Sequence, residues 1–187
     1  MRRIAVLLAA LAGLAAPARG QSAASVRETA LARVARAQAL SADPELVKAV
    51  LDKNATQEPM EDVARKDKEW VENPRYPLRK TLSESACAQR LRDLTREDRI
   101  IVEVILMDDQ GANVCVSRET SDYWQGDEAK FQKTFGAGKD VFVDEPALDA
   151  STGVYAIQLS VLVRDQGRKI GALTLSLRVP KRDVSAP

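Results

Sequence analysis

The sequence contains no histidine among its 187 residues. Histidine is the usual general base near neutral pH and a common zinc ligand, so its absence excludes Ser-His and Cys-His dyads and most zinc sites. No Gly-x-Ser-x-Gly motif or metal-ligand spacing replaces it. Carboxylate pairs occur at Asp108-Asp109 and Asp144-Glu145, but the first lies in a turn pattern and the second precedes Pro146. The sequence therefore predicts a protein that is not an enzyme, and we expect no cofactor.

The sequence also lacks an excess of positive or of negative charge. The 28 Lys and Arg residues nearly balance the 27 Asp and Glu residues, and the formal net charge is +1. A nucleic-acid-binding protein normally carries a basic field, so we expect no nucleic-acid partner.

Long apolar runs are absent except at the N-terminus. Met1-Arg2-Arg3 precedes the apolar run 4–16, and the small-residue pattern Ala18-Arg19-Gly20 follows it. These are the parts of a secretory signal peptide, which predicts a segment 1–20 removed before Gln21 and a periplasmic product. An uncleaved anchor is the alternative, although the run is shorter than the roughly 20 residues of a membrane span.

Cysteine is scarce, with only Cys87 and Cys115. In an exported protein an even pair can form one disulfide. Two buried thiols are the alternative, because one cysteine lies in an expected helix and the other in an expected strand. The distance between the two Cα atoms and the directions of their Cβ atoms decide between these alternatives, and the sequence does not give them.

The region 21–96 has helical periodicity. Asp43 has the character of an N-cap before Pro44, and Trp70 stands near the end of another apolar stripe. We expect these helices at 22–38, with a break near Ser41 before the next helix, and at 58–71 and 83–94. Asn73-Pro74 and Tyr76-Pro77 are expected to end the helix at 58–71, because the residue before a proline avoids the helical region.

The region 97–180 changes to β-branched and apolar residues, with glycine turns at 108–111 and 165–168. Strands are expected at 100–107, 112–117, 140–144, 155–164 and 169–179. Helices followed by strands joined mainly by tight turns predict an α+β domain on an antiparallel sheet, with a tail at 181–187 expected to be disordered.

The last two strands have unequal faces, one apolar and one of small polar residues that includes Gln158. Glu103 joins the polar face if the register places it there, and its apolar neighbours indicate a shielded carboxylate that needs a partner. This face is either a pocket wall or the solvated side of the sheet.

An insertion at 118–139 carries two of the few aromatic rings, Tyr123 and Trp124. We expect Asp127 to cap a short helix that runs to Phe135 and ends at Gly136. Paired rings beside polar residues can close over a small ligand, or they can anchor the insertion in the core.

These residues resemble a known family. The pattern Ile105-Leu106-Met107-Asp108, the segment 120–130 (TSDYWQGDEAK) and the final hairpin with Gln158-Leu159-Ser160-Val161 and Ile170-Gly171-Ala172-Leu173-Thr174 are similar to Cache (PDC-type) sensor domains. The resemblance implies a PAS-like antiparallel sheet of five to six strands preceded by long helices. It also implies a pocket between sheet and insertion, framed by Tyr123, Trp124, Asp127 and Lys130, with Asp149 facing the same opening.

The chain ends at Pro187, soon after the last expected strand, whereas most such sensors continue into a signalling module. The sequence therefore predicts an exported small-molecule-binding sensor that acts through a separate partner, such as a membrane-bound sensor or transporter. A structural or interaction protein with a vestigial pocket is the alternative. Under either prediction the Ala- and Leu-rich N-terminal helix can form a homodimer.

Overall fold

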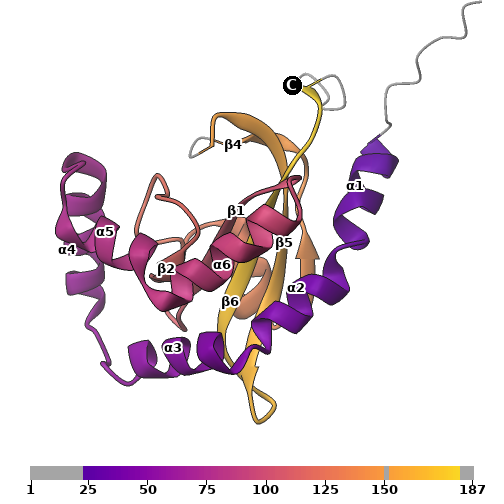
Figure 1. Ribbon diagram of the computed structural model, residues 1–187. Coiled ribbons are helices and arrows are strands. Elements are labelled where there is room, and N and C mark those ends of the chain that lie inside the picture. Colours follow the sequence, from indigo (N-terminus) through magenta and orange to yellow (C-terminus); the bar gives the residue numbers. More distant parts are fainter. Residues whose placement is uncertain (1–22, 150–151, 182–187) are drawn as a thin grey trace, which may run out of the picture.

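The computed structural model describes residues 23–149 and 152–181. The expected signal peptide 1–20 and residues 182–187 of the expected tail lie outside them. In this described part of the chain, six helices precede the sheet (Figure 1). They are α1 (Ala23–Leu31), α2 (Val34–Ser41), α3 (Pro44–Asn54), α4 (Met60–Glu72), α5 (Pro77–Glu84) and α6 (Ala86–Glu97). No helix in the described ranges has the length and apolarity that a membrane crossing requires.

The strands form one antiparallel sheet in the order β2-β1-β6-β5-β3, with β4 pairing β5 beside this path. They are β1 (Ile101–Met107), β2 (Asn113–Val116), β3 (Val141–Val143), β4 (Ala147–Asp149), β5 (Val154–Asp165) and β6 (Arg168–Arg178). Between β2 and β3 the chain forms α7 (Ala129–Phe131) and the π-helical turn η1 (Gln132–Gly136). The predicted α+β class, with helices ahead of an antiparallel sheet, is confirmed.

Local signals explain several helix starts. The Asp43 carboxylate accepts a hydrogen bond from the Glu45 amide at 2.9 Å, and Pro44 occupies the first helical position, as predicted. The N-terminal helix is interrupted twice, at Ala32-Arg33 as well as beside Asp43.

The helix expected at 83–94 is two helices in the structure. The helix expected at 58–71 ends at Glu72, before the two prolines, as predicted, but Pro77 also begins α5, because proline at the first helical position loses no intrahelical hydrogen bond. Ser85 then caps α6 by accepting a hydrogen bond from the Ala88 amide at 3.1 Å. The short strand β4 was also missed, since three residues carry too little periodicity to be recognised.

The two faces of the sheet have different coverings. Helices α1, α2, α3 and α6 cover one face and enclose the main core, which takes the apolar side chains of β5 and β6 (Figure 1). The insertion covers part of the other face, where Phe131 packs with Ile105, Met107 and Ala172. The Phe131 and Phe135 rings stack with centroids 5.1 Å apart, which attaches the insertion helix to the sheet.

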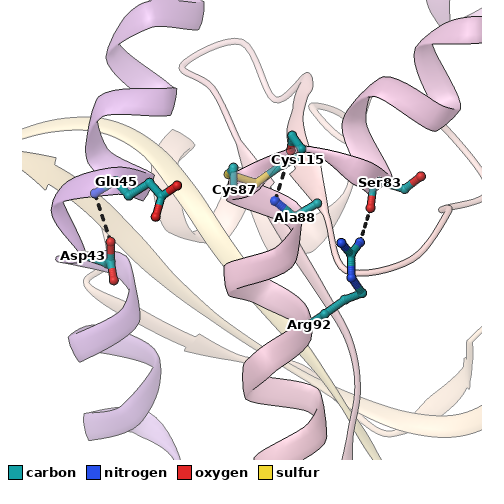
Figure 2. The surroundings of a disulfide bond; sticks show 8 residues. Asp43, Glu45, Ser83, Cys87, Ala88, Arg92 and Cys115 are labelled. Atoms are coloured by element: carbon teal, nitrogen blue, oxygen red, sulfur yellow. Dashed lines mark hydrogen bonds between the residues drawn. A yellow bond between two sulfur atoms is a disulfide. The ribbon is translucent and has the colours of Figure 1, made fainter.

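Cys87 and Cys115 form a disulfide, which decides between the two alternatives left by the sequence. The bond joins the first turn of α6 to β2, with the two Cα atoms 6.0 Å apart (Figure 2). Both cysteines are buried, so the bond fastens the helical layer to the sheet from within the core.

We expect the double variant Cys87→Ala/Cys115→Ala to lower the free energy of unfolding by about 3–4 kcal/mol, because the bond closes a loop with a sequence separation of 28. The melting temperature should fall on the order of 10 °C, measured by calorimetry. Reductant should bring the wild-type protein close to the variant and leave the variant itself unchanged. Equal melting of the oxidised wild type and the variant would contradict this prediction.

Candidate functional site

A cavity of about 370 Å³ lies on the sheet face opposite the main helical layer. Its walls come from β1, β5, the insertion and the segment from the end of β3 through β4. The lining residues are Glu103, Ile105, Thr120, Ser121, Asp122, Gln125, Glu128, Lys130, Asp144, Glu145, Ala147, Leu148, Asp149, Ala156 and Gln158. The volume lies at the lower end of the range typical of small-molecule pockets.

Strand register builds the floor of this cavity. Ser176 of β6 pairs with Glu103 of β1 on one side and with Gln158 of β5 on the other, so the three residues form one polar row. Ser176 Oγ lies 3.5 Å from a Glu103 carboxylate oxygen, and Glu103 is only 2% exposed. A shielded carboxylate at this position was predicted. The face is a pocket wall here and not a solvated surface.

The next polar row of the same sheet face lies outside the cavity lining. Ser160 and Thr174 are directly paired, and their hydroxyls share a hydrogen bond of 2.8 Å with no exposure to solvent. Because the two buried hydroxyls are hydrogen-bonded to each other, most of the free-energy cost of removing them from water is offset. The polar face therefore continues under the insertion, where Phe131 and Ile105 shield it.

The insertion contributes a second polar wall. Lys130 is 5% exposed, and its Nζ donates a 2.9 Å hydrogen bond to the Glu128 carboxylate. Gln125 is also buried and donates from Nε2 to the Asp122 carbonyl at 2.9 Å. A buried ammonium and a buried amide on the cavity wall can both make directional contacts to a polar ligand.

Helix α4 holds this wall from behind. One Asp67 carboxylate oxygen accepts hydrogen bonds from the backbone amides of Tyr123 and Trp124, both at 2.9 Å. Trp70 Nε1 donates to the Thr120 carbonyl at 2.9 Å. These three bonds place the segment that carries Thr120, Asp122 and Gln125 against the cavity.

The two predicted aromatic rings lie on the α4 side. Tyr123 is 1% exposed, and its ring centroid is 6.0 Å from that of Trp70. Trp124 Nε1 donates to the Gln110 carbonyl at 2.8 Å. Both rings belong to an apolar cluster with Val63, so the structure places them as anchors of the insertion and not among the lining residues.

A charged network lies beside Tyr123. Burial raises the pKa of the Tyr123 hydroxyl well above its usual value, and the nearby Glu58 and Asp108 carboxylates add to this shift. Burial also opposes ionisation of Glu58, but hydrogen bonds from Lys53 and Lys66 outweigh it and lower the pKa of Glu58. At neutral pH the phenol is therefore protonated and the Glu58 carboxylate is charged.

Glycine permits the close approach of the first hairpin turn to the insertion. Gly111 has φ +83°, and a Cβ there would lie 2.5 Å from the Gly126 Cα. Gln125 N donates to the Gly111 carbonyl at 2.8 Å across this contact. Glycine at both positions allows the hairpin turn to support the same wall that α4 holds.

The structure brings together four of the seven residues predicted for the site, namely Glu103, Lys130, Asp149 and Gln158. Tyr123, Trp124 and Asp127 lie outside the lining. Asp127 is exposed, and the expectation that it caps the insertion helix is wrong, because Glu128 occupies the N-cap position without a side-chain cap. The spacing of residues alone could not show which of the two neighbouring acidic residues occupies the N-cap position.

Sequence reasoning did not select Asp122, Gln125 and Glu128 as site residues, although they stand in the same insertion motif. It also considered Asp144 and Glu145 only as a catalytic pair, whereas both line the cavity. Neighbouring side chains in an extended segment point in opposite directions. If Tyr123 packs in the core, Asp122 is therefore expected to face the other way, and the sequence could have indicated this.

We expect Asp67→Ala to lower the free energy of unfolding by about 2–3 kcal/mol, because it leaves two backbone amides without their charged acceptor. Hydrogen exchange at the Tyr123 and Trp124 amides should accelerate more than elsewhere. Lys68→Ala, at the exposed next position, is the matched control and should change neither measurement. Unchanged exchange at these amides in Asp67→Ala would refute the role assigned to the carboxylate.

No family model and no curated protein sequence matches the chain. Among solved structures it is similar to the sensor domain of the V. cholerae histidine kinase DctB, with a TM-score of 0.53 and 14% identity over 83% of this chain. The alignment covers 52% of that chain, so this protein spans about half its length.

More distant similarities connect it to ligand-binding domains of chemoreceptors. The Campylobacter jejuni chemoreceptor Tlp3 with isoleucine bound gives 16% identity and a TM-score of 0.42, over 84% of this chain and 62% of that one. The ligand-binding domain of the Pseudomonas aeruginosa PAO1 chemoreceptor PctC in complex with GABA gives 21% identity and a TM-score of 0.41. The alignment covers 63% of this chain and 56% of that one. The likeness to the DctB domain confirms the predicted fold, an antiparallel sheet preceded by helices.

Proposed function

We propose that this protein is an exported sensor module of the Cache type that binds a small molecule in the cavity between its sheet and its insertion. One observation carries the proposal, namely the set of buried polar side chains that line the cavity. Glu103, Gln125 and Lys130 are each at most 5% exposed yet adjoin an open volume of about 370 Å³. Buried polar groups beside such a volume are typical of ligand sites, where a few polar contacts orient the ligand.

In this proposal the ligand contacts the floor through Glu103 and Gln158 and the wall through Asp149, and the Lys130 ammonium contributes to the charge that the ligand meets. Tyr123 and Trp124 act indirectly, because they fix the insertion against α4. The arrangement supports binding and not catalysis, since its residues fit hydrogen bonding and charge pairing and the chain has no histidine.

Export to the periplasm is part of the proposal. The Cys87–Cys115 disulfide supports it, because such bonds persist in oxidising compartments. We further propose that a separate partner reads the ligand state. Helix α4 lies behind the cavity wall and carries two exposed apolar residues, Met60 and Val71, which can contribute to a contact surface.

A thermal-shift screen of the purified protein against amines, amino acids, organic acids, nucleobases and sugars tests this function. A ligand at 100 times its dissociation constant should stabilise the protein by about 2.7 kcal/mol, which raises the melting temperature by about 5–10 °C.

The response should change in Lys130→Met, which keeps the bulk of a buried side chain and removes its charge. An anionic ligand should bind this variant more weakly than the wild type, and a cationic ligand should bind it more tightly. It should persist in Lys133→Met, because Lys133 is exposed nearby and does not line the cavity. A flat screen on well-folded protein would oppose ligand binding and leave the structural or interaction role.

A further inference from the structure

The cavity has a strong excess of acidic over basic side chains. Six carboxylates line it, contributed by Glu103, Asp122, Glu128, Asp144, Glu145 and Asp149. Among the described lining residues Lys130 is the single base. The whole chain has a net charge of +1, so the acidic character is local to this cavity and is not a property of the composition.

The one lysine does not neutralise this excess. Its Nζ is bonded to Glu128. Within the described ranges Asp122, Asp144 and Glu145 form no ion pair. The Asp122 carboxylate accepts a hydrogen bond from Ser121 Oγ at 3.0 Å, and the Asp144 carboxylate accepts one from the Glu145 amide at 2.8 Å. These bonds orient the carboxylates without offsetting them by a base, so the cavity attracts cations.

The distribution of the carboxylates does not suit a metal ion. Across the described residues, no group of three or more Asp, Glu, Cys or His side chains comes close enough together to hold one. The charges instead come from separate elements, with Asp122 in the insertion and Asp144 at the end of β3. Separated charges match a ligand whose own positive charges are separated.

Apolar side chains occupy the space between the charges. Ile105 and Ala156 on the floor are buried, while Ala147 and Leu148 of β4 form an exposed rim. Such surfaces favour a methylene chain over a strongly hydrated ion, because burying each CH₂ contributes roughly 0.8 kcal/mol.

We propose that the ligand is an aliphatic amine with two or more ammonium groups joined by methylenes. This inference rests on the proposed function, since it assigns the ligand class of the same cavity. Carboxylates from different elements, such as Asp122 and Asp144, bind separate ammonium groups, and the apolar residues contact the carbon chain. A dicarboxylate would meet repulsion from most of the lining.

Calorimetric titration of the intact protein with 1,4-diaminobutane and with spermidine tests the inference. Both should bind, and affinity should fall as the salt concentration rises, because the contacts are ionic. Matched probes are butylamine, which has one charge, butanedioate, which has the same carbon number and opposite charge, and Mg²⁺. We expect butylamine to bind at least tenfold more weakly than the diamine, and butanedioate and Mg²⁺ not to compete.

Asp122→Asn and Asp144→Asn should each weaken diamine binding about tenfold, since each removes a charged hydrogen-bond acceptor. Asp127→Asn is the matched control, because Asp127 lies in the same insertion but outside the lining, and it should bind like the wild type. Without ligand the two cavity variants should melt at the same or a higher temperature than the wild type, since each relieves repulsion between like charges.

The results separate the two proposals. Binding of butanedioate or a neutral compound that depends on Lys130, with no diamine binding, would overturn the amine inference and keep the sensor function. Mg²⁺ binding that depends on Asp122 and Asp144 and excludes the diamine would also overturn it. No binding of any probe or screened compound to folded protein would overturn both.

Discussion

The cavity depends on one carboxylate on the far side of its wall. Asp67 of α4 binds the amides of two consecutive residues, Tyr123 and Trp124, and no β-ladder supports this stretch apart from a single bridge between Ala112 and Trp124. Backbone amides that leave water need an acceptor, and an ionised carboxylate is among the strongest available. Fixing these two amides also fixes the direction of the neighbouring side chains. The rings enter the cluster around Trp70, and Asp122 and Gln125 are left facing the cavity.

A sheet with one apolar and one polar face is an ordinary surface sheet until something covers the polar face. Here the stacked Phe131 and Phe135 rings bring the insertion over that face. Each polar side chain that is buried beneath the insertion then needs a hydrogen-bond partner. Ser160 and Thr174 meet this need by bonding each other, whereas Lys130 retains one carboxylate partner at the cavity wall. The difference separates a closed structural contact from a surface that can still engage a ligand.

The sequence predicted the parts of the fold that local chemistry determines. Asp43 and Pro44 start α3, alternation along β5 and β6 identifies the core face, and glycine marks the hairpin turns. The helix start at Pro77 was missed because proline both ends and begins helices, and the choice depends on the residues that pack around it. In the site, Glu103 and Gln158 were identifiable from strand alternation. The roles of Tyr123 and Asp122 were not, since they depend on which side of the insertion α4 occupies, and that is a long-range contact.

In the proposed function, the same long-range contact would connect a ligand in the cavity to the outer surface. Thr120 lines the cavity, and its carbonyl accepts a hydrogen bond from the indole N–H of Trp70. A single residue therefore connects the cavity wall to α4. A ligand can shift an equilibrium only through interactions that differ between two states. Carboxylates that repel one another in the empty cavity supply such a difference, because a cation between them removes the repulsion. The insertion carries one of these carboxylates, Asp122, directly beside the amides that Asp67 binds, so in the proposed function charge neutralisation in the cavity would act on the segment that α4 holds.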